Sequence, residues 1–304
     1  MRITWRIIGT ALVALCVLSA GVFLRIDAGQ AQGGPSGKIH LTVGGKLDTE
    51  AQLLSTLYVL LLRHAGFPVT DKTKLGTNEI VHQAIVSGQI DLYPEFTATG
   101  LARLKLKTTH DPEKDYQLVK AGYEKDYHVT WLDKAPLNDT YGICTTKDKA
   151  AQLKTAKISD LAPMAAKLTV ATPPDGKTDP NVLPGLKPAY GFDFGQVKVL
   201  DAALTYQAVQ QGQADVNVCY TTSALITKLG FVLLEDDKSL FPIYEPAPIV
   251  RDDTLRKAPS IASTLNPLAP KLTSEVSRQL QLEVNNGKSV TQAATEWLKA
   301  QGML

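Results

Sequence analysis

The sequence predicts an α/β protein with two lobes of ordinary size and a ligand cleft between them. The chain has 304 residues, of which 44% are hydrophobic and 20% are charged, so it is long enough to form two compact cores and nothing in it suggests disorder. Short apolar strands alternate with helical segments, which is typical of parallel α/β layers. One unit of helix, glycine and strand also occurs twice along the chain. These three observations justify the fold class.

The N-terminal segment is predicted to be an export signal. Arg2 and Arg6 precede an apolar run at 7–24, and small residues before the break favour cleavage after Ala31. Residues 1–31 are therefore expected to be a signal peptide, which places the mature chain in the periplasm. The alternative is an uncleaved membrane anchor, because the apolar run is just long enough to span a bilayer.

Removal of residues 1–31 would change both the net charge and the cysteine content of the chain. The formal net charge of the whole chain is +2, and residues 1–31 carry all of it, so the mature chain is neutral and no nucleic-acid partner is expected. Cys16 leaves with the signal peptide. Cys144 and Cys219 then enter an oxidising compartment, where they form either a disulfide bond or two separate buried thiols.

The elements of the first half follow a short linker at 32–37. Alternating apolar residues at 39–43 predict a strand, and leucines at helical spacing predict a helix that ends at Gly66. The chain extends again directly afterwards. Thr77 or Asn78 begins a further helix that ends at Gly88. A buried strand comes next and leads into Tyr-Pro-Glu-Phe.

The second half continues the alternation. Four further strands are predicted, at Val129–Leu132, Leu168–Ala171, Val197–Leu200 and Ala214–Val218. Between them, residues 173–188 contain five prolines and two glycines, which predicts a constrained loop rather than a regular element. The last fifty residues are predicted to be helical, with N-caps near Thr273 and Ser289.

The repeated unit predicts where a ligand binds. "AIVSGQIDL" at 84–92 matches "AVQQGQADV" at 208–216, and the same register aligns Phe96 with Tyr220, each followed by hydroxyl side chains. Ligands of open parallel sheets bind beyond the carboxyl ends of the strands, where helices begin. Two such units predict two lobes whose strand ends face one cleft. A chance similarity between two common units is the alternative, and it also predicts an α/β fold.

Several longer segments resemble one protein family. "GQIDLYPEFTATGL", "WLDKAPLNDTYGICTTKD" and "VLLEDDKSLFPIYEPAPIVRDD" are similar to the substrate-binding proteins of osmoprotectant ABC importers, which capture glycine betaine, choline or related quaternary amines, and the similarity runs from Lys38 to the C-terminus. The resemblance implies a type II-like periplasmic-binding-protein fold, with lobe 1 at 38–141 plus 245–304 and lobe 2 at 142–244. It also implies a monomer that serves an ABC permease and needs no cofactor.

The same resemblance implies a ligand site made largely of aromatic rings. A trimethylammonium group has no N–H to donate, so it is recognised best by the faces of aromatic rings. Lys46 is retained from the motif that opens the family's mature domain. Matching the family's motifs residue by residue assigns these positions to ligand binding: Phe96, Thr99, Asp139, Tyr141, Tyr220, Tyr244 and Lys46.

Two departures from the family pattern bear on the ligand. Asp48 replaces a phenylalanine near the start of the mature domain, which implies a changed first-lobe wall. Residues 175–179, "DGKTD", contain no arginine where betaine binders have one, and lysine lacks the two-pronged geometry that holds a carboxylate. This favours a ligand without a carboxylate, such as choline, or else weak binding of glycine betaine. Because both cysteine-containing runs border the implied cleft, a Cys144–Cys219 disulfide is also a hypothesis.

Other functions are disfavoured by the residues present. The five histidines show no metal-ligand spacing, and no nucleophile elbow or phosphate-binding glycine loop occurs, so neither a metal site nor catalysis is expected. Asp91, Glu95 and Asp139 are candidate general bases, but no partner nucleophile is identifiable. The remaining alternative is a binding protein for another small cationic or amino-acid-like solute.

Overall fold

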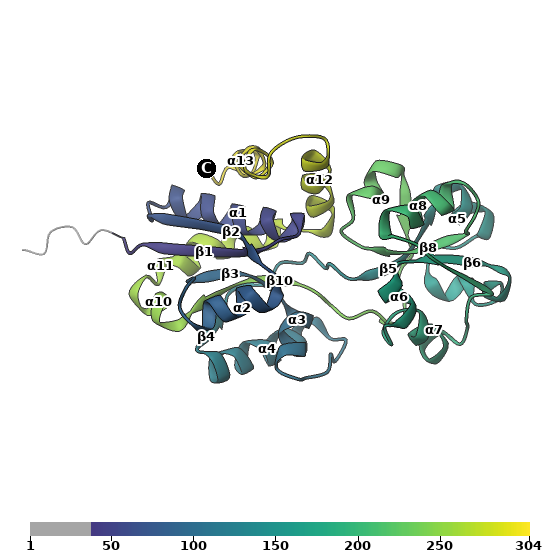
Figure 1. The fold of residues 1–304 in the computed structure, drawn as a ribbon, viewed down its shortest axis with the longest axis horizontal. Helices are drawn as coiled ribbons and strands as arrows, with labels where there is room; N and C mark the ends of the chain where they lie inside the picture. The colour runs from purple at the N-terminus through teal and green to yellow at the C-terminus, as the bar shows by residue number, and fades with distance from the viewer. Residues whose placement is uncertain (1–37) are drawn as a thin grey trace, which may run out of the picture. The chain divides into compact units, whose positions relative to one another are not determined.

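The computed structural model describes residues 38–304, and the predicted signal peptide and its anchor alternative lie outside them. The described chain contains two five-stranded sheets, each flanked by helices (Figure 1). The predicted two-lobed α/β fold is confirmed. We call the lobe built on the first sheet the first lobe and the other the second lobe.

The sheet of the first lobe has the order β2-β1-β3-β10-β4. The strands β1, β2 and β3 are parallel, whereas β10 is antiparallel to both of its neighbours, so the sheet is mixed. The predicted first strand at 39–43 lies two residues too early. The strands are β1 (Leu41–Lys46), β2 (Val69–Gly76), β3 (Leu92–Phe96), β4 (Val129–Trp131) and β10 (Pro246–Arg251).

The sheet of the second lobe repeats this plan with the order β7-β6-β8-β5-β9. Here β6 is parallel to β7 and β8, and β5 is antiparallel to β8 and β9. In each sheet the fourth strand of the order, β10 or β5, is thus antiparallel to its neighbours. The strands are β5 (Tyr141–Thr146), β6 (Thr169–Thr172), β7 (Gln196–Val199), β8 (Val216–Tyr220) and β9 (Phe231–Leu233).

The helices fall into three groups along the chain. The first lobe begins with α1 (Thr49–His64), α2 (Asn78–Val86), α3 (Thr97–Arg103) and α4 (Pro112–Tyr127). The second lobe contains α5 (Lys147–Leu153), η1 (Ile158–Leu161), η2 (Ala165–Lys167), α6 (Pro174–Thr178), α7 (Leu183–Tyr190), α8 (Ala202–Gln210) and α9 (Ala224–Leu229). The chain ends with α10 (Asp252–Lys257), α11 (Ser260–Leu265), η3 (Asn266–Lys271), α12 (Ser274–Asn285) and α13 (Val290–Ala300).

The predicted helix caps at the C-terminal end are confirmed. The hydroxyl of Thr273 accepts a hydrogen bond from the backbone N–H of Val276, at 3.2 Å, and that of Ser289 accepts one from Gln292, at 3.1 Å. These bonds satisfy N–H groups that the first turns of α12 and α13 leave without helical partners. The C-terminal helices then return to the first lobe, where α13 packs against α1.

The prediction of a loop at 173–188 is wrong, because two short helices, α6 and α7, form there. Pro174 and Pro184 stand in the first turns of these helices, where the missing N–H would have had no helical partner in any case. Pro188 lies inside α7, which ends two residues later and is followed by Gly191 in the left-handed conformation. Proline content alone therefore did not exclude helix here.

The chain crosses between the two sheets twice, and the two crossing segments are bonded to each other. The first connects β4 to β5 and the second connects β9 to β10. The N–H of Asp139 donates to the carbonyl of Tyr244, at 3.1 Å, and the hydroxyl of Thr140 donates to the carbonyl of Pro242, at 2.6 Å. The lobes are thus joined by a two-stranded connection, which is the usual place for a hinge.

A second link between the lobes comes from α12, which packs against α9. Arg278 Nη1 donates to the carbonyl of Thr221, at 2.6 Å, and Gln281 Nε2 donates to the carbonyl of Thr222, at 2.9 Å. Both acceptors belong to the turn that follows β8. One C-terminal helix of the first lobe therefore holds a backbone turn of the second.

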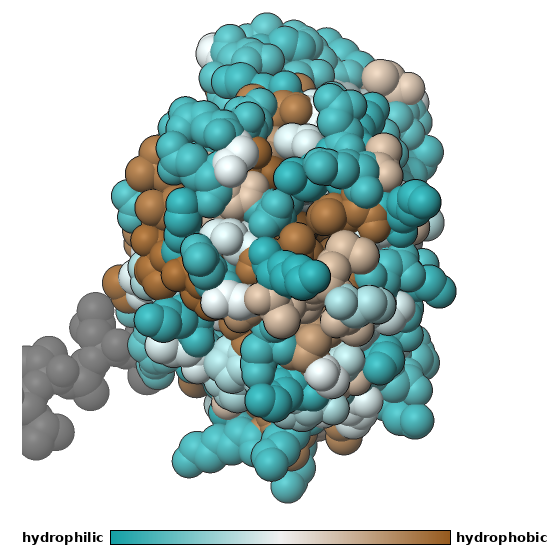
Figure 2. Space-filling model, turned by 90° about the vertical axis from the view of Figure 1, so that its right-hand side faces the viewer, coloured by the Kyte–Doolittle hydropathy of each residue, from teal (hydrophilic) through white to brown (hydrophobic). Residues whose placement is uncertain are grey.

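The surface at the end of the second lobe is largely hydrophilic, with hydrophobic side chains gathered in a few places (Figure 2). The large hydrophobic side chains exposed in this lobe include Val197 and Val199 on the edge strand β7 and Leu204 on α8. Within residues 38–304, no helix combines the length and the hydrophobicity that a membrane-spanning helix needs.

Candidate functional site

A cavity of about 230 Å³ lies between the lobes, at the carboxyl ends of β1, β3 and β8. Every residue that the sequence assigned to ligand binding lines it. The sequence reasoning missed Asn78 and Thr140, and named Asp48 only as a departure from the family. The complete lining is Lys46, Asp48, Asn78, Phe96, Thr99, Asp139, Thr140, Tyr141, Tyr220 and Tyr244.

Two tyrosines form the second-lobe wall of the cavity. Tyr141 begins β5 and Tyr220 ends β8, and the antiparallel register of these strands pairs the two residues directly. Their ring centroids are 5.1 Å apart and the ring planes are tilted by 36°. Such a cross-strand pair places two ring faces side by side. Both side chains are only partly buried.

A disulfide bond lies directly behind this pair. It joins Cys144 in β5 to Cys219 in β8, as hypothesised from the sequence, and both cysteines are almost completely buried. Cys219 precedes Tyr220 in the same strand. The bond therefore ties together the two strands that carry the tyrosines. A disulfide stabilises a fold mainly by restricting the unfolded chain.

The first-lobe wall contains a buried ion pair between Lys46 and Glu95. Lys46 Nζ lies 2.6 Å from Glu95 Oε1, and Glu95 has no exposed surface. Glu95 also accepts hydrogen bonds from the hydroxyl of Tyr93, at 2.8 Å, and from the backbone N–H of Phe96, at 2.9 Å. A buried carboxylate needs such partners. The charge of Lys46 is thus neutralised from behind the cavity.

Phe96 adds the third ring, from the end of β3. Its side chain is mostly buried in the first-lobe core, at 7% exposure, and Lys46 Nζ lies 5.0 Å from the ring centroid. The lysine ammonium therefore already makes a cation–π contact with this ring. Thr99 lies one helical turn further on in α3, whereas the hydroxyl of Thr97 donates to the carbonyl of Ile243 and so serves the second crossing segment.

Asp139 and Tyr244 come from the two crossing segments. The hydroxyl of Thr222 donates to Asp139 Oδ1 at 2.6 Å, yet burial raises the pKa of this carboxyl above its usual range, and the charge of Asp48 adds to the shift. Burial likewise raises the pKa of the Tyr244 hydroxyl, with contributions from Asp179 and Asp139. Asn138 fixes the position of Tyr244, because its Oδ1 accepts the Tyr244 N–H at 2.8 Å.

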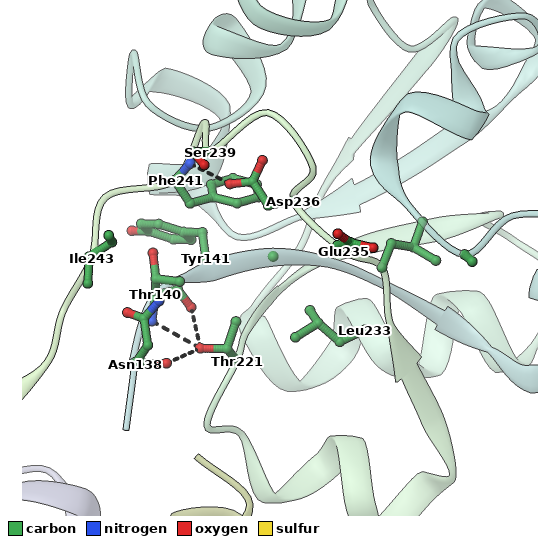
Figure 3. Close-up of a pocket in the computed structure, with 13 residues that line it drawn as sticks. Asn138, Thr140, Tyr141, Thr221, Leu233, Glu235, Asp236, Ser239, Phe241 and Ile243 are labelled. Carbon is green, nitrogen blue, oxygen red and sulfur yellow. Dashed lines mark hydrogen bonds between the residues drawn. The ribbon is translucent and has the colours of Figure 1, made fainter. Parts of the chain in front are cut away.

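Two larger hollows adjoin the cavity. One, of about 410 Å³, lies on the second lobe and is lined by Tyr141 together with Phe241, Ile243 and Leu233, as Figure 3 shows. The other, of about 470 Å³, lies between α3 and the second lobe and includes Tyr244. Each contains one of the four predicted rings. The cavity of about 230 Å³ is therefore the site at which the predicted residues converge.

Three further tyrosines and one histidine lie away from the cavity. Tyr93, Tyr190 and Tyr206 are all buried. His82 packs edge-on against Tyr127, with ring centroids 4.7 Å apart, and burial lowers its pKa to about 4. In the part of the chain that the structure describes, no cluster of three or more histidine, cysteine or acidic residues is arranged to hold a metal ion.

A scan against family models matches residues 39–300 to the substrate-binding domain of ABC-type glycine betaine transport systems. The chain belongs to this family. The substrate-binding domains of the family bind a small solute and work with an ABC permease, so the prediction of a transport binding protein is confirmed.

Individual relatives agree with the family assignment. The glycine betaine-binding protein YehZ of Escherichia coli is 32% identical over 274 residues, covering 86% of this chain and 90% of YehZ. The carnitine transport binding protein OpuCC of Listeria monocytogenes is 29% identical over 279 residues, covering 90% of each chain.

Solved structures of relatives share the fold over their whole length. The structure of apo YehZ matches with a TM-score of 0.79 at 30% identity, covering 87% of this chain and 99% of YehZ. A structure described as a glycine betaine/carnitine/choline ABC transporter matches with a TM-score of 0.81 at 27% identity, covering 88% of this chain and 99% of that one.

Proposed function

We propose that this protein captures a quaternary ammonium cation between its lobes and delivers it to an ABC permease. The observation that carries the proposal is the convergence of three tyrosines, one phenylalanine and Asp139 on a single cavity between the lobes. Each ring face in contact with a cation contributes about 0.5 to 2 kcal/mol, more where water is excluded. Three or four faces together are enough for binding in the micromolar range.

The charges around the cavity favour a ligand without a carboxylate, such as choline. Lys46 is the one lysine or arginine among the described residues that line the cavity, and Glu95 neutralises it. Asp48 and Asp139 both line the cavity and favour a net positive ligand. Glycine betaine is the second candidate, because relatives of this chain are named for it. Its carboxylate would have to compete with Glu95 for Lys46.

Residue roles also support a binding protein rather than an enzyme. Of the candidate general bases, Asp91 accepts hydrogen bonds from the N–H of Thr42 and the hydroxyl of Thr254, and Glu95 is bound to Lys46. Both carboxylates are therefore engaged in holding the first lobe together. We further propose that the mature chain is monomeric, is exported to the periplasm by residues 1–31, and has no nucleic-acid partner because its net charge is zero.

Calorimetric titration of the mature protein with choline, glycine betaine, carnitine and an amino-acid mixture tests this function. We expect choline to bind with a dissociation constant in the micromolar range and glycine betaine to bind more weakly. The amino acids should give no heat of binding. A response to the amino-acid mixture alone would contradict the proposal.

A further inference from the structure

A second acid lies next to Asp139, outside the cavity lining. Glu50, in the first turn of α1, has a side chain that is 5% exposed. Its Oε1 accepts a hydrogen bond from the hydroxyl of Ser277 in α12, and its Oε2 accepts none from another side chain or backbone group. The carboxyl that neighbours it is that of Asp139. Two carboxyls thus meet where α1, α12 and the first crossing segment come together.

The groups around the pair do not compensate two negative charges. Asp48 adds a third acid from the start of α1, and the hydroxyls of Ser277 and Thr222 are the donors on the α12 and second-lobe sides. Lys46 faces Asp139 but is bound to Glu95. Two further ionisable side chains are near. Tyr244 is neutral at physiological pH, and Arg278 donates to the backbone of Thr221.

Adjacent carboxyls in a buried place do not both ionise readily. Burial raises the pKa of Glu50 well above its ordinary value of 4.5, and the neighbouring Asp139 raises it further. The pKa of Asp139 is raised as well, chiefly by burial. Such a pair loses its two protons in separate steps that belong to the pair as a whole. Between these two steps the pair holds one proton and carries one negative charge.

We propose that Glu50 recognises the charge of the ligand through Asp139: the two carboxyls share one proton while the cavity is empty and release it to solvent when a cation binds beside Asp139. The inference rests on the proposed function, since it requires a cationic ligand in the cavity. Charge is conserved in the step, because one cation enters and one proton leaves. Glu50 is thus a positioning and charge-selecting residue that does not touch the ligand.

The sign of the pH dependence follows from proton release. A bound cation favours the doubly ionised pair, so binding lowers the pKa of the pair and releases the proton. The affinity for the cation then rises with pH across the window between the pKa of the occupied pair and that of the empty pair. Outside that window the protonation state of the pair does not change on binding, so the pair contributes no pH dependence to the affinity.

Calorimetry in buffers of different ionisation enthalpy measures the released proton directly. We expect the wild-type protein to release up to one proton per choline at a pH above the ordinary carboxyl range. Glu50→Gln mimics the protonated acid and should bind choline with proton release close to zero and a flat pH profile. Glu124→Gln, which removes an exposed acid of α4, is the control and should keep the wild-type release.

An uncharged ligand gives a second test that needs no variant. In the carbon isostere of choline, a tert-butyl group replaces the trimethylammonium group, so its binding to the wild-type protein should release no proton. If choline binds without proton release at every pH, the inference is wrong while the proposed function stands. Release that persists in Glu50→Gln assigns the proton to another group and also overturns it. If choline does not bind at all, the proposed function fails and the inference with it.

Discussion

The two copies of the repeated unit are stabilised by the same glycine and aspartate positions, but the aromatic residue at the end of the strand differs. In each copy a helix ends at a glycine with positive φ, Gly88 at 79° and Gly212 at 70°, and a short buried strand follows. The aspartate of each unit accepts the backbone N–H of a neighbouring strand residue. Asp91 Oδ2 lies 2.7 Å from the N of Thr42, and Asp215 Oδ2 lies 2.9 Å from the N of Thr169.

The strands then end in different environments. Phe96, in the first lobe, is almost buried and its ring is approached by Lys46, whereas Tyr220, in the second, is partly exposed and pairs with Tyr141. The first-lobe wall therefore contains a mostly buried ring beside an ion pair, whereas the second-lobe wall presents two partly exposed rings to the cavity. The repeated residues therefore stabilise each lobe internally, whereas the residues at the strand ends line the cavity.

The largest effect is expected from breaking the ion pair that distinguishes the first lobe. Lys46→Met leaves Glu95 charged and buried without its cation, which should lower the free energy of unfolding by about 3 to 5 kcal/mol. Urea unfolding of the variant at neutral pH measures this loss. The double variant Lys46→Met, Glu95→Gln should recover most of the stability. An equal loss in both would show that the charge of Glu95 is not responsible.

The shared aspartates should give intermediate and similar effects in the two lobes. Asp91→Ala and Asp215→Ala each remove a charge-assisted hydrogen bond to a strand N–H, and each should lower the free energy of unfolding by about 1.5 to 3 kcal/mol. Urea unfolding provides the measurement, and Asp148→Ala in α5 is a surface control. A large loss in only one lobe would break the equivalence of the two units.

Variants of the two aromatic residues should distinguish an effect on ligand affinity from an effect on stability. Tyr220→Ala removes a ring face from the cavity and should weaken choline binding by about 1 to 3 kcal/mol with little change in the unfolding midpoint. Phe96→Leu should lower stability as well as affinity, because the ring belongs both to the first-lobe core and to the cavity lining. Calorimetric titration and thermal unfolding of both variants make the comparison. Unchanged affinity in Tyr220→Ala contradicts the aromatic site.

The smallest expected effect is a loss of stability at acid pH that arises in the first lobe. Since burial lowers the pKa of His82 to about 4, against an ordinary value of 6.5, the folded state disfavours its protonation. The stability contributed by neutral His82 is complete above pH 6.5 and is lost as the pH falls towards about 4, by about 1 kcal/mol at pH 6.

The matched variant for this test is His82→Phe, which keeps a ring against Tyr127 but cannot titrate. The midpoint of thermal unfolding is measured for the wild-type and variant proteins from about pH 7.5 to about pH 5, a range that spans the ordinary pKa of histidine. The two curves should diverge as the pH falls. Parallel curves would mean that His82 is not the acid-sensitive group.

Much of the fold could be predicted because its signals are local. Helix spacing, glycine stops and the caps at Thr273 and Ser289 each depend on residues within a few positions of one another. The insertion of β10 between β3 and β4 could not be predicted this way, since it brings together residues more than a hundred positions apart. The helices α6 and α7 were missed because proline was taken as a breaker at positions where a first turn accepts it.

The cavity could be predicted to the extent that its residues occur in recognisable runs. Phe96 and Tyr220 were indicated by the repeat, and Tyr141 and Tyr244 by family resemblance. Glu50 belongs to the same family motif as Lys46, but its burial could not be predicted, because a charged residue in the first turn of a helix normally faces solvent and favours the helix dipole. In the folded chain it is buried and bonded to Ser277, 227 residues further along the sequence. Such long-range burial leaves no local pattern in a sequence.

The hydrogen bonds from α12 to the turn after β8 matter for the design of modified versions of this protein. Arg278 and Gln281 donate to the carbonyls of the two residues that follow Tyr220, so the C-terminal helix α12 helps to position a ring that lines the cavity. Truncating the tail or attaching a reporter to it would alter the cavity from a distance. Purification tags and fluorescent sensors are therefore better inserted in a surface loop remote from both crossing segments.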